Sequence, residues 1–222
     1  MIETRNVSLA TESQRFLVVL DVDSTLIENE AIELLAAEAG SLERVTAVTE
    51  RAMRGELDFA ESLRERVATL AGLPDSVFDT VRSQITVTQG AQKLIETVKF
   101  HGGHVGVVSG GFHELLDPLA ESLGLDFWKA NRLEIIDGRL TGNVLGDIVD
   151  AQSKADTLIE WANLTNTPLS HTVAIGDGAN DLLMMGVAGL GIAFCAKPIV
   201  QEQADVALNV RDLSKALEIF GL

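Results

Sequence analysis

Short runs of apolar residues alternate along the chain with longer stretches in which apolar residues recur three and four positions apart. The short runs predict strands that are buried on both faces, at Phe16–Leu20, His104–Val108, His171–Gly176, Leu190–Phe194 and Asp205–Leu208. The longer stretches predict amphipathic helices over Ala91–Phe100, Glu114–Leu123, Ser153–Trp161 and Leu213–Phe220. Because strands alternate with helices, we expect an α/β fold with a parallel, doubly wound sheet.

Two segments interrupt this alternation. Roughly sixty residues between Ile27 and Thr88 contain no good strand, and their apolar residues recur at helical spacing, which predicts an inserted helical subdomain. Between Asn131 and Asp147, two apolar runs flank Asp137-Gly138, a pair that favours a hairpin turn. We therefore expect a core domain made of residues 1–27 and 89–222, with a helical insertion at residues 28–88.

The charge balance limits the partners. The chain has 222 residues, and its 33 acidic residues against 17 lysines and arginines give a formal net charge of −16. Such a surface repels nucleic acid and anionic lipid, so we expect neither a nucleic-acid nor a membrane partner. It also repels an anionic substrate, so a phosphate site would have to supply its own local positive charge. The pattern does not decide between a monomer and a homodimer.

The single cysteine and the N-terminal residues bear on location. Cys195 cannot form an internal disulfide, and its apolar neighbours predict a buried structural thiol; with no histidine nearby in sequence, a catalytic thiol is the weaker alternative. Residues Met1–Gln14 contain no apolar signal-peptide core, and no apolar run is long enough to span a membrane. We therefore expect a cytoplasmic protein.

Polar residues follow three of the predicted strands: Asp21, Ser109 and Asp177. Ligands bind at the carboxyl ends of strands in open parallel sheets. Any one of these residues alone is explained as well by capping of the following helix. The three together, with the neighbours described next, indicate a functional site.

The first cluster is Asp21-Val22-Asp23-Ser24-Thr25. Two carboxylates two residues apart after a buried strand are costly unless a cation or a reaction uses them. One carboxylate can attack phosphorus, and the other can protonate the departing alkoxide and then activate water. A pair of aspartates at this spacing is common on surface loops, so it is the preceding strand that makes the signal informative.

Two further positions could bind a phosphate. Ser109-Gly110-Gly111 offers a hydroxyl and closely approachable backbone N–H groups before a helix, although an N-cap with a flexible turn explains it equally well. Lys154 on a predicted helix would ordinarily be a solvated surface residue. The need for local positive charge in so acidic a chain favours a functional role for it.

The most specific string is Gly176-Asp177-Gly178-Ala179-Asn180-Asp181. Two carboxylates and an amide directly after a strand suit Mg²⁺, which prefers a few oxygen ligands plus substrate phosphate and water. An EF-hand Ca²⁺ loop is the competing metal site. Its twelve-residue spacing and terminal Glu are missing, and a strand leads into the string instead of a helix.

These motifs, in this order, resemble the four motifs of the haloacid dehalogenase superfamily and, within it, the phosphoserine phosphatase family. The resemblance extends from about Phe16 to the C-terminus and includes strings of little obvious chemistry, such as Ala130–Leu133 and Ala193–Pro198. It implies a Rossmann-like core with a helical cap inserted after the first motif. It also implies Mg²⁺ as cofactor and hydrolysis of O-phosphoserine through an aspartyl-phosphate, the last step of serine biosynthesis.

The resemblance implies a role for each motif residue. Asp21 would be the nucleophile and a Mg²⁺ ligand, together with Asp177 and the backbone carbonyl of Asp23. Asp23 would also be the general acid and base, and Asp181 would orient the metal site. The phosphate would be contacted by Ser109, Gly110, Lys154 and Asn180.

The cap would select the substrate. By the same resemblance, Glu30 would bind the ammonium group of phosphoserine and Arg66 its carboxylate, while Met53 and Phe59 would line that pocket. Without the resemblance, Glu30 and Arg66 would be taken as exposed helical charges.

Two other functions remain to be weighed. A relative that transfers the phosphoryl group to an acceptor such as homoserine would keep every catalytic residue and differ in the cap. A non-enzymatic phospho-acceptor module, like a response-regulator receiver domain, needs an acceptor Asp but no acid two residues later and no large cap. Asp23 and the inserted segment argue against that second alternative.

Overall fold

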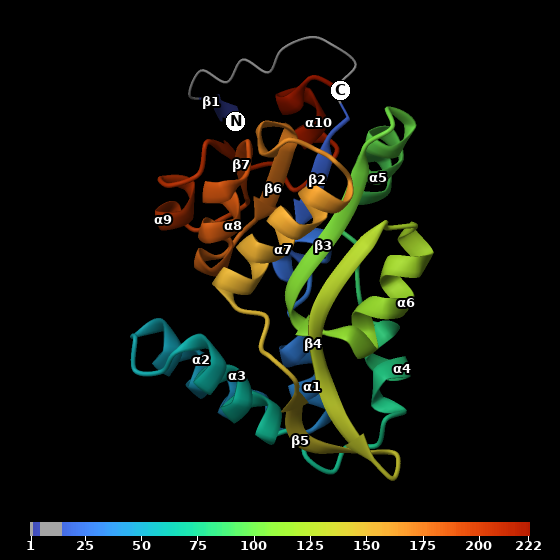
Figure 1. Cartoon of the computed structure of the whole chain (residues 1–222). Coiled ribbons are helices and arrows are strands. Elements are labelled where there is room, and N and C mark those ends of the chain that lie inside the picture. Colours follow the sequence, from blue (N-terminus) through green and yellow to red (C-terminus); the bar gives the residue numbers. More distant parts are fainter. Residues whose placement is uncertain (1, 5–14) are drawn as a thin grey trace.

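The computed structural model describes residues 2–4 and 15–222, without the side chains of residues 2–4 and of Met53. It contains an eight-stranded sheet in the order β1-β8-β7-β6-β2-β3-β4-β5 (Figure 1). The strands are β1 (Ile2–Thr4), β2 (Leu17–Leu20), β3 (His104–Phe112), β4 (Phe127–Ile136), β5 (Arg139–Leu145), β6 (Thr172–Gly176), β7 (Leu190–Phe194) and β8 (Val206–Leu208). Only β1 and β5, at the two edges, run antiparallel to their neighbours. The predicted α/β class is confirmed.

Helices cover both faces of the sheet because alternate strand residues point to opposite sides. Val18 and Leu20 of β2 belong to an apolar cluster that includes residues of α5 (Ala91–Phe100), α6 (His113–Leu123) and α10 (Lys215–Phe220). Leu17 and Val19 belong to another, with residues of α7 (Ala151–Leu164), α8 (Leu182–Val187) and α9 (Pro198–Gln201). The central strand is therefore buried on both sides, as the uninterrupted apolar run predicted.

The segment after β2 is helical, as expected. It begins with the irregular turn η1 (Val22–Leu26) and continues as α1 (Ala31–Glu38), α2 (Leu42–Met53), α3 (Phe59–Ala68) and α4 (Val77–Arg82). A capping box between Asp58 and Glu61 starts α3. These helices share a third apolar cluster with Phe112 and Leu115 and with the β4–β5 hairpin, so they pack below the carboxyl ends of the strands in Figure 1.

The predicted hairpin is present, with Asp137 at φ +51° and Gly138 at φ +72°. Positive φ at both central residues is the geometry of a type I′ turn, which Asp-Gly favours. The strand before this turn is longer than the pattern indicated: β4 begins at Phe127 and pairs in parallel with β3. Because Lys129 and Asn131 interrupt its apolar residues, this part of the strand could not be predicted from the hydrophobic pattern.

Two other expectations need correction. Residues Ile2–Thr4 form an edge strand that was not predicted. Cys195 is only partly buried, so the expectation of a buried thiol is wrong. Among the described residues, no helix combines the length and the apolar character needed to cross a bilayer.

Gly106 in the middle of β3 offers a test of the packing between sheet and α7. A Cβ atom there would lie 2.6 Å from Cζ3 of the buried Trp161 ring. We expect Gly106→Ala to lower the free energy of unfolding by about 1–3 kcal/mol, the usual cost of overpacking a core. Urea denaturation measures this. The control is Gly186→Ala in α8, where a Cβ meets nothing within 4 Å and a helical alanine should stabilise. Equal behaviour of the two variants would contradict the packing argument.

Candidate active site

Three neighbouring strands position the catalytic candidates. Strand β2 pairs in parallel with β3 on one side and β6 on the other, so their carboxyl ends meet at one edge of the sheet. Asp21 directly follows β2, Asp177 directly follows β6, and Ser109 lies in the last part of β3. The backbone N–H of Asp21 donates to the carbonyl of Ile175 at 2.8 Å, which ties the first motif to the strand that carries the fourth.

Lys154 lies beneath this edge, fully buried, and bridges two carboxylates. Its Nζ atom is 2.7 Å from Oδ1 of Asp21 and 2.7 Å from Oδ1 of Asp181. Burial opposes the charge on Lys154, but the two carboxylates outweigh it and raise the pKa of this lysine. Lys154 therefore stays charged, and the ordinary expectation of a solvated helical lysine does not apply here.

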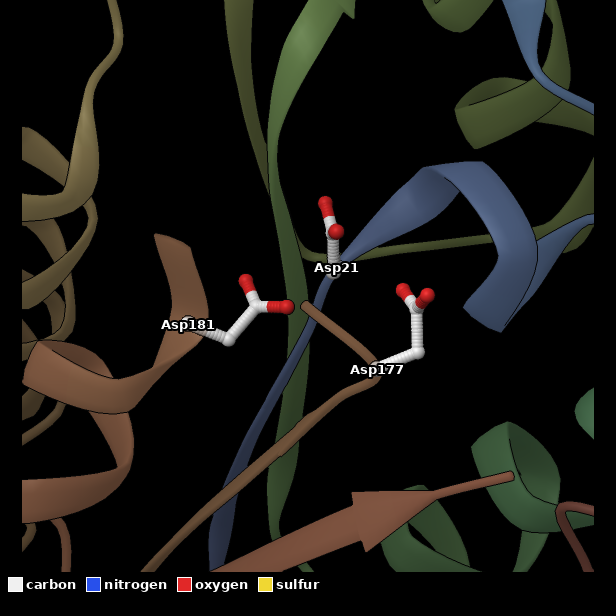
Figure 2. A group of neighbouring side chains, drawn as sticks. All are labelled: Asp21, Asp177 and Asp181. Carbon is white, nitrogen blue, oxygen red and sulfur yellow. The ribbon is translucent and has the colours of Figure 1, made fainter. Parts of the chain in front are cut away.

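Asp21, Asp177 and Asp181 point toward a common space (Figure 2). One carboxylate oxygen of each can be chosen so that all three atoms lie within 4.8 Å of one another. Both oxygens of Asp181 already have partners, since Oδ1 binds Lys154 and Oδ2 accepts the Gly178 N–H at 3.0 Å. Asp181 is thus placed to orient the loop, and Asp21 and Asp177 are the carboxylates available to a cation.

The electrostatics of these two carboxylates fit a bound metal ion. Burial, together with the nearby Asp181 carboxylate, raises the pKa of Asp21 well above its usual range despite the Lys154 ammonium. The same two causes raise the pKa of Asp177 to about 6. The Lys154 ammonium alone does not offset the burial of these carboxylates and the repulsion between them. A divalent cation that prefers oxygen ligands would provide the missing positive charge. The hydroxyl of Thr25 donates to Asp177 Oδ1 at 3.3 Å and helps hold this carboxylate in place.

Asp23 is held separately from the other carboxylates. Its Oδ1 accepts the backbone N–H of Ala31 at 2.7 Å, at the first turn of α1, and its Oδ2 accepts the Ser109 hydroxyl at 3.3 Å. Burial raises the pKa of Asp23 in spite of these hydrogen bonds. A carboxyl group with a raised pKa retains a proton more readily, which suits a general acid.

The inserted segment lines the site from the other side. Asp21, Asp23 and Asp177 line a cavity of about 140 Å³, and Glu30 and Arg66 line it too. Glu30 is solvent-accessible as a residue, but nearby protein atoms partly desolvate its carboxylate. This desolvation, together with the negative charge of the neighbouring Asp23, raises the pKa of Glu30 to about 7. No carboxylate of the described residues lies within ion-pairing distance of Arg66, whose Nε donates to the Ser62 carbonyl at 3.2 Å.

The structure brings most of the predicted site residues together. Phe59, Gly110 and Asn180 line the same cavity, while Ser109, Lys154 and Asp181 lie behind its wall and reach it through hydrogen bonds. Met53 ends α2, and its side chain lies outside what the structure describes. Gly111 and Gly178, from two of the motif strings, also line the cavity, as do three residues to which the sequence analysis assigned no role: Ile32, Leu63 and Phe112.

Helical spacing could have identified one of these. Phe59, Leu63 and Arg66 are four and three positions apart on α3 and therefore share a face. Because Phe59 and Arg66 were assigned to the pocket, Leu63 on the same face could have been assigned to it as well. Thr25 and Asn131 support the site by hydrogen bonds; both stand in strings that carry the family resemblance, but the sequence assigned neither of them a role.

Comparisons with known proteins identify the family of this chain. The sequence model of the haloacid dehalogenase-like hydrolase family matches residues 18–186. The phosphoserine phosphatase of Streptococcus thermophilus is 54% identical over 203 residues, which are 91% of this chain and 94% of that protein. That of Streptomyces coelicolor is 58% identical over 206 residues, 93% of this chain but 50% of that protein. The chain thus spans nearly all of one relative and about half of the other.

Solved structures resemble the chain as a whole. A substrate-bound complex of a phosphoserine phosphatase has a TM-score of 0.88 at 44% identity and covers 94% of this chain and 99% of that one. A phospho-aspartyl intermediate analogue of a phosphoserine phosphatase has a TM-score of 0.87 at 45% identity, with 93% and 99% covered. The fold and the arrangement of the sheet are therefore shared with these enzymes.

The buried bridge made by Lys154 predicts a stability effect. Lys154→Met would leave the carboxylates of Asp21 and Asp181 buried without a cation. We expect the free energy of unfolding in chelator-treated protein to fall by about 3–5 kcal/mol, as when one partner of a buried pair is removed. The control is Lys215→Met, which removes an exposed lysine paired with Glu218 and should change stability far less. Urea denaturation of both variants decides, and equal losses would contradict the buried-bridge argument.

Proposed function

Because this chain belongs to the haloacid dehalogenase-like hydrolases, we propose that it is a magnesium-dependent phosphatase that hydrolyses free O-phosphoserine to serine and phosphate. One observation carries the proposal: a single cavity is lined by carboxylates of the sheet and by Glu30 and Arg66 of the inserted segment. The carboxylates with a cation suit a phosphate dianion. Glu30 and Arg66 suit the ammonium and carboxylate of a free amino acid, each of which needs an opposite charge when desolvated.

In the proposed reaction, Asp21 attacks phosphorus and forms an aspartyl-phosphate. Asp23, held by the Ala31 N–H, gives its proton to the departing serine oxygen and then takes one from the water that hydrolyses the intermediate. Mg²⁺, held by Asp21, Asp177 and the Asp23 carbonyl, would reduce the repulsion between these carboxylates and the phosphate. Asp181 orients this site through Lys154 and the Gly178 N–H.

Positive charge and hydrogen-bond donors for the phosphate come from three further elements. The Ser109 hydroxyl and the Gly110 N–H lie at the end of β3, and Asn180 lines the cavity from the loop after β6. Lys154 adds a buried positive charge 2.7 Å behind the Asp21 carboxylate. Preorganised groups of this kind stabilise charge that develops in the transition state.

We propose that specificity resides in a cap of residues 28–88, set into a core of residues 1–27 and 89–222. The two crossings between these parts lie side by side: the Glu28 N–H donates to the Thr86 carbonyl at 2.8 Å, and the Thr88 N–H donates to the Leu26 carbonyl at 2.9 Å. Glu30, Met53, Phe59 and Arg66 belong to the cap. A cytoplasmic location and a place in serine biosynthesis follow from this substrate.

The first test is removal of the metal. Turnover of phosphoserine should stop after exhaustive chelation and return when Mg²⁺ is added. Ca²⁺ should restore little, because it prefers six to eight oxygen ligands at longer distances. Asp177→Asn should raise the Mg²⁺ concentration needed for half-maximal rate, since Asp177 is one of the two carboxylates available to the ion. Full activity in the metal-free protein would refute this part of the proposal.

The second test concerns substrate choice. Arg66→Ala should lose on the order of 10²–10³ in kcat/KM for phosphoserine, because a broken buried charge pair costs roughly 2–5 kcal/mol. The loss should be far smaller for phosphoethanolamine, which lacks the carboxylate. Arg66→Lys should lie between Arg66→Ala and the wild type, since lysine cannot form the two-pronged pair.

Arg64→Ala provides the matched control, because Arg64 is an exposed arginine on the same helix. It should leave both substrates unaffected. Homoserine added to part of the assays distinguishes phosphoryl transfer from hydrolysis. If Arg66→Ala lowers activity equally on both substrates, Arg66 is a structural residue and the phosphoserine assignment loses its main support in this chain.

A further inference from the structure

Strand β3 bulges where the phosphate-binding residues lie. Val108 pairs with Lys129 and Phe112 pairs with Asn131. More residues therefore lie between the two paired positions on β3 than on β4. The residues between Val108 and Phe112 are Ser109, Gly110 and Gly111. A bulge frees backbone groups from the ladder, and those groups then need other partners.

Asn131 on β4 supplies one of these partners. Its side chain is 1% exposed, and its Nδ2 donates to the Gly110 carbonyl at 2.8 Å. Its Oδ1 accepts the Val149 N–H at 2.9 Å. The reverse orientation of the amide would set acceptor against acceptor and donor against donor, so the two backbone partners fix it.

The two contacts join the bulge to the start of helix α7. Val149 directly precedes Asp150, whose carboxylate caps α7 by accepting the Ser153 N–H at 2.8 Å. Lys154 follows one residue later and reaches Asp21. Asn131 therefore connects the two elements that carry Ser109 and Lys154, the hydroxyl and the ammonium proposed for the phosphate.

The contact with Gly110 also sets the direction of the Ser109 hydroxyl. With its carbonyl held by Asn131, the Gly110–Gly111 peptide directs the Gly111 N–H to Ser109 Oγ at 2.7 Å. The hydroxyl, having accepted that bond, gives its own hydrogen toward Asp23 Oδ2, 3.3 Å away at the cavity. A peptide between two glycines can flip at low steric cost. After a flip the carbonyl would face Ser109 and draw its hydrogen away from the site.

We propose that Asn131 is a positioning residue for phosphate transfer: by holding the Gly110 carbonyl it prevents this flip and keeps the Ser109 hydroxyl available to the phosphate. The inference rests on the proposed function, since it assumes that Ser109 contacts phosphate. If the proposal holds, Asn131 affects activity by positioning Ser109.

A double-mutant cycle tests this coupling between Asn131 and Ser109, since coupled residues give non-additive effects. Asn131→Leu removes both contacts at similar volume and should lower kcat/KM for phosphoserine about 10²-fold, as misplaced groups do. In a Ser109→Ala background the same substitution should cost less than about threefold by this argument. Binding of inorganic phosphate in the presence of Mg²⁺, measured by calorimetry, gives a second cycle that needs no turnover.

Thr172→Val is the matched control. Thr172 is also buried and also bridges two backbone groups, donating to the Leu169 carbonyl and accepting the Gly189 N–H, but at the start of β6, away from the site. Thr172→Val should lower the stability of the protein and keep kcat/KM within about threefold of the wild type, because a substitution distant from the site acts independently of the groups in it. Thermal unfolding of each variant checks that all assays are made on folded protein.

The outcomes separate cleanly. The proposal is overturned if Asn131→Leu costs no more activity than Thr172→Val, or if its loss is as large in the Ser109→Ala background as alone. Asn131→Ala replaces Asn131→Leu if the latter does not fold, and failure of both to fold would make Asn131 purely structural, which also overturns it. A wild type inactive on phosphoserine would refute the proposed substrate, while the phosphate-binding cycle would still decide the role of Asn131.

Discussion

The contact on which the site depends is the buried ammonium of Lys154 between Asp21 and Asp181. The sheet brings several carboxylates to one edge, and without internal positive charge they would take up protons or repel one another. In a chain with a net charge of −16, the buried ammonium of Lys154 places positive charge directly beside these carboxylates. Leu158 and Trp161 of helix α7 pack against the sheet, and this packing fixes the position of Lys154 on the same helix. Asp21, the proposed nucleophile, is thus joined to Asp181 and to helix α7 by the single ammonium group of Lys154.

Much of this fold was predictable because the strands that carry the site are uninterrupted apolar runs with a polar residue at each end. The parts that were missed have a common physical cause. The first half of β4 is buried by its parallel pairing with β3 and by Phe127 stacking on Trp161, but Lys129 and Asn131 hide this in the sequence. The burial of Lys154 was equally invisible, since it depends on two carboxylates that are distant along the chain.

The site residues divide in the same way. Those that act through their own chemistry stand in recognisable strings after strands, and Leu63 shares a helical face with two residues of the predicted pocket. Thr25 and Asn131 act by fixing other groups, and their partners are set by tertiary structure: Thr25 binds Asp177 of another motif, and Asn131 binds two backbone groups. A single sequence does not distinguish such residues from ordinary buried polar ones.

In the proposed function, the groups that catalyse the reaction and those that select the substrate belong to different parts of the chain that remain in contact. Asp21 and Asp177 are anchored to strand ends, whereas Asp23 also accepts the backbone N–H of Ala31 in the inserted segment. The chain passes between the two parts at paired crossings near Ile27 and Val87, and the inserted helices also pack against Phe112, Leu115 and the β4–β5 hairpin. Yet Glu30 lies at the start of the insertion, and its Oε1 accepts the hydroxyl of Ser24 at 2.6 Å, with Ser24 held at φ +57° directly after Asp23. Under the proposed function, a ligand that binds the Glu30 carboxylate would act on a group hydrogen-bonded one residue from Asp23, the proposed general acid, which would couple substrate recognition to the geometry of that acid.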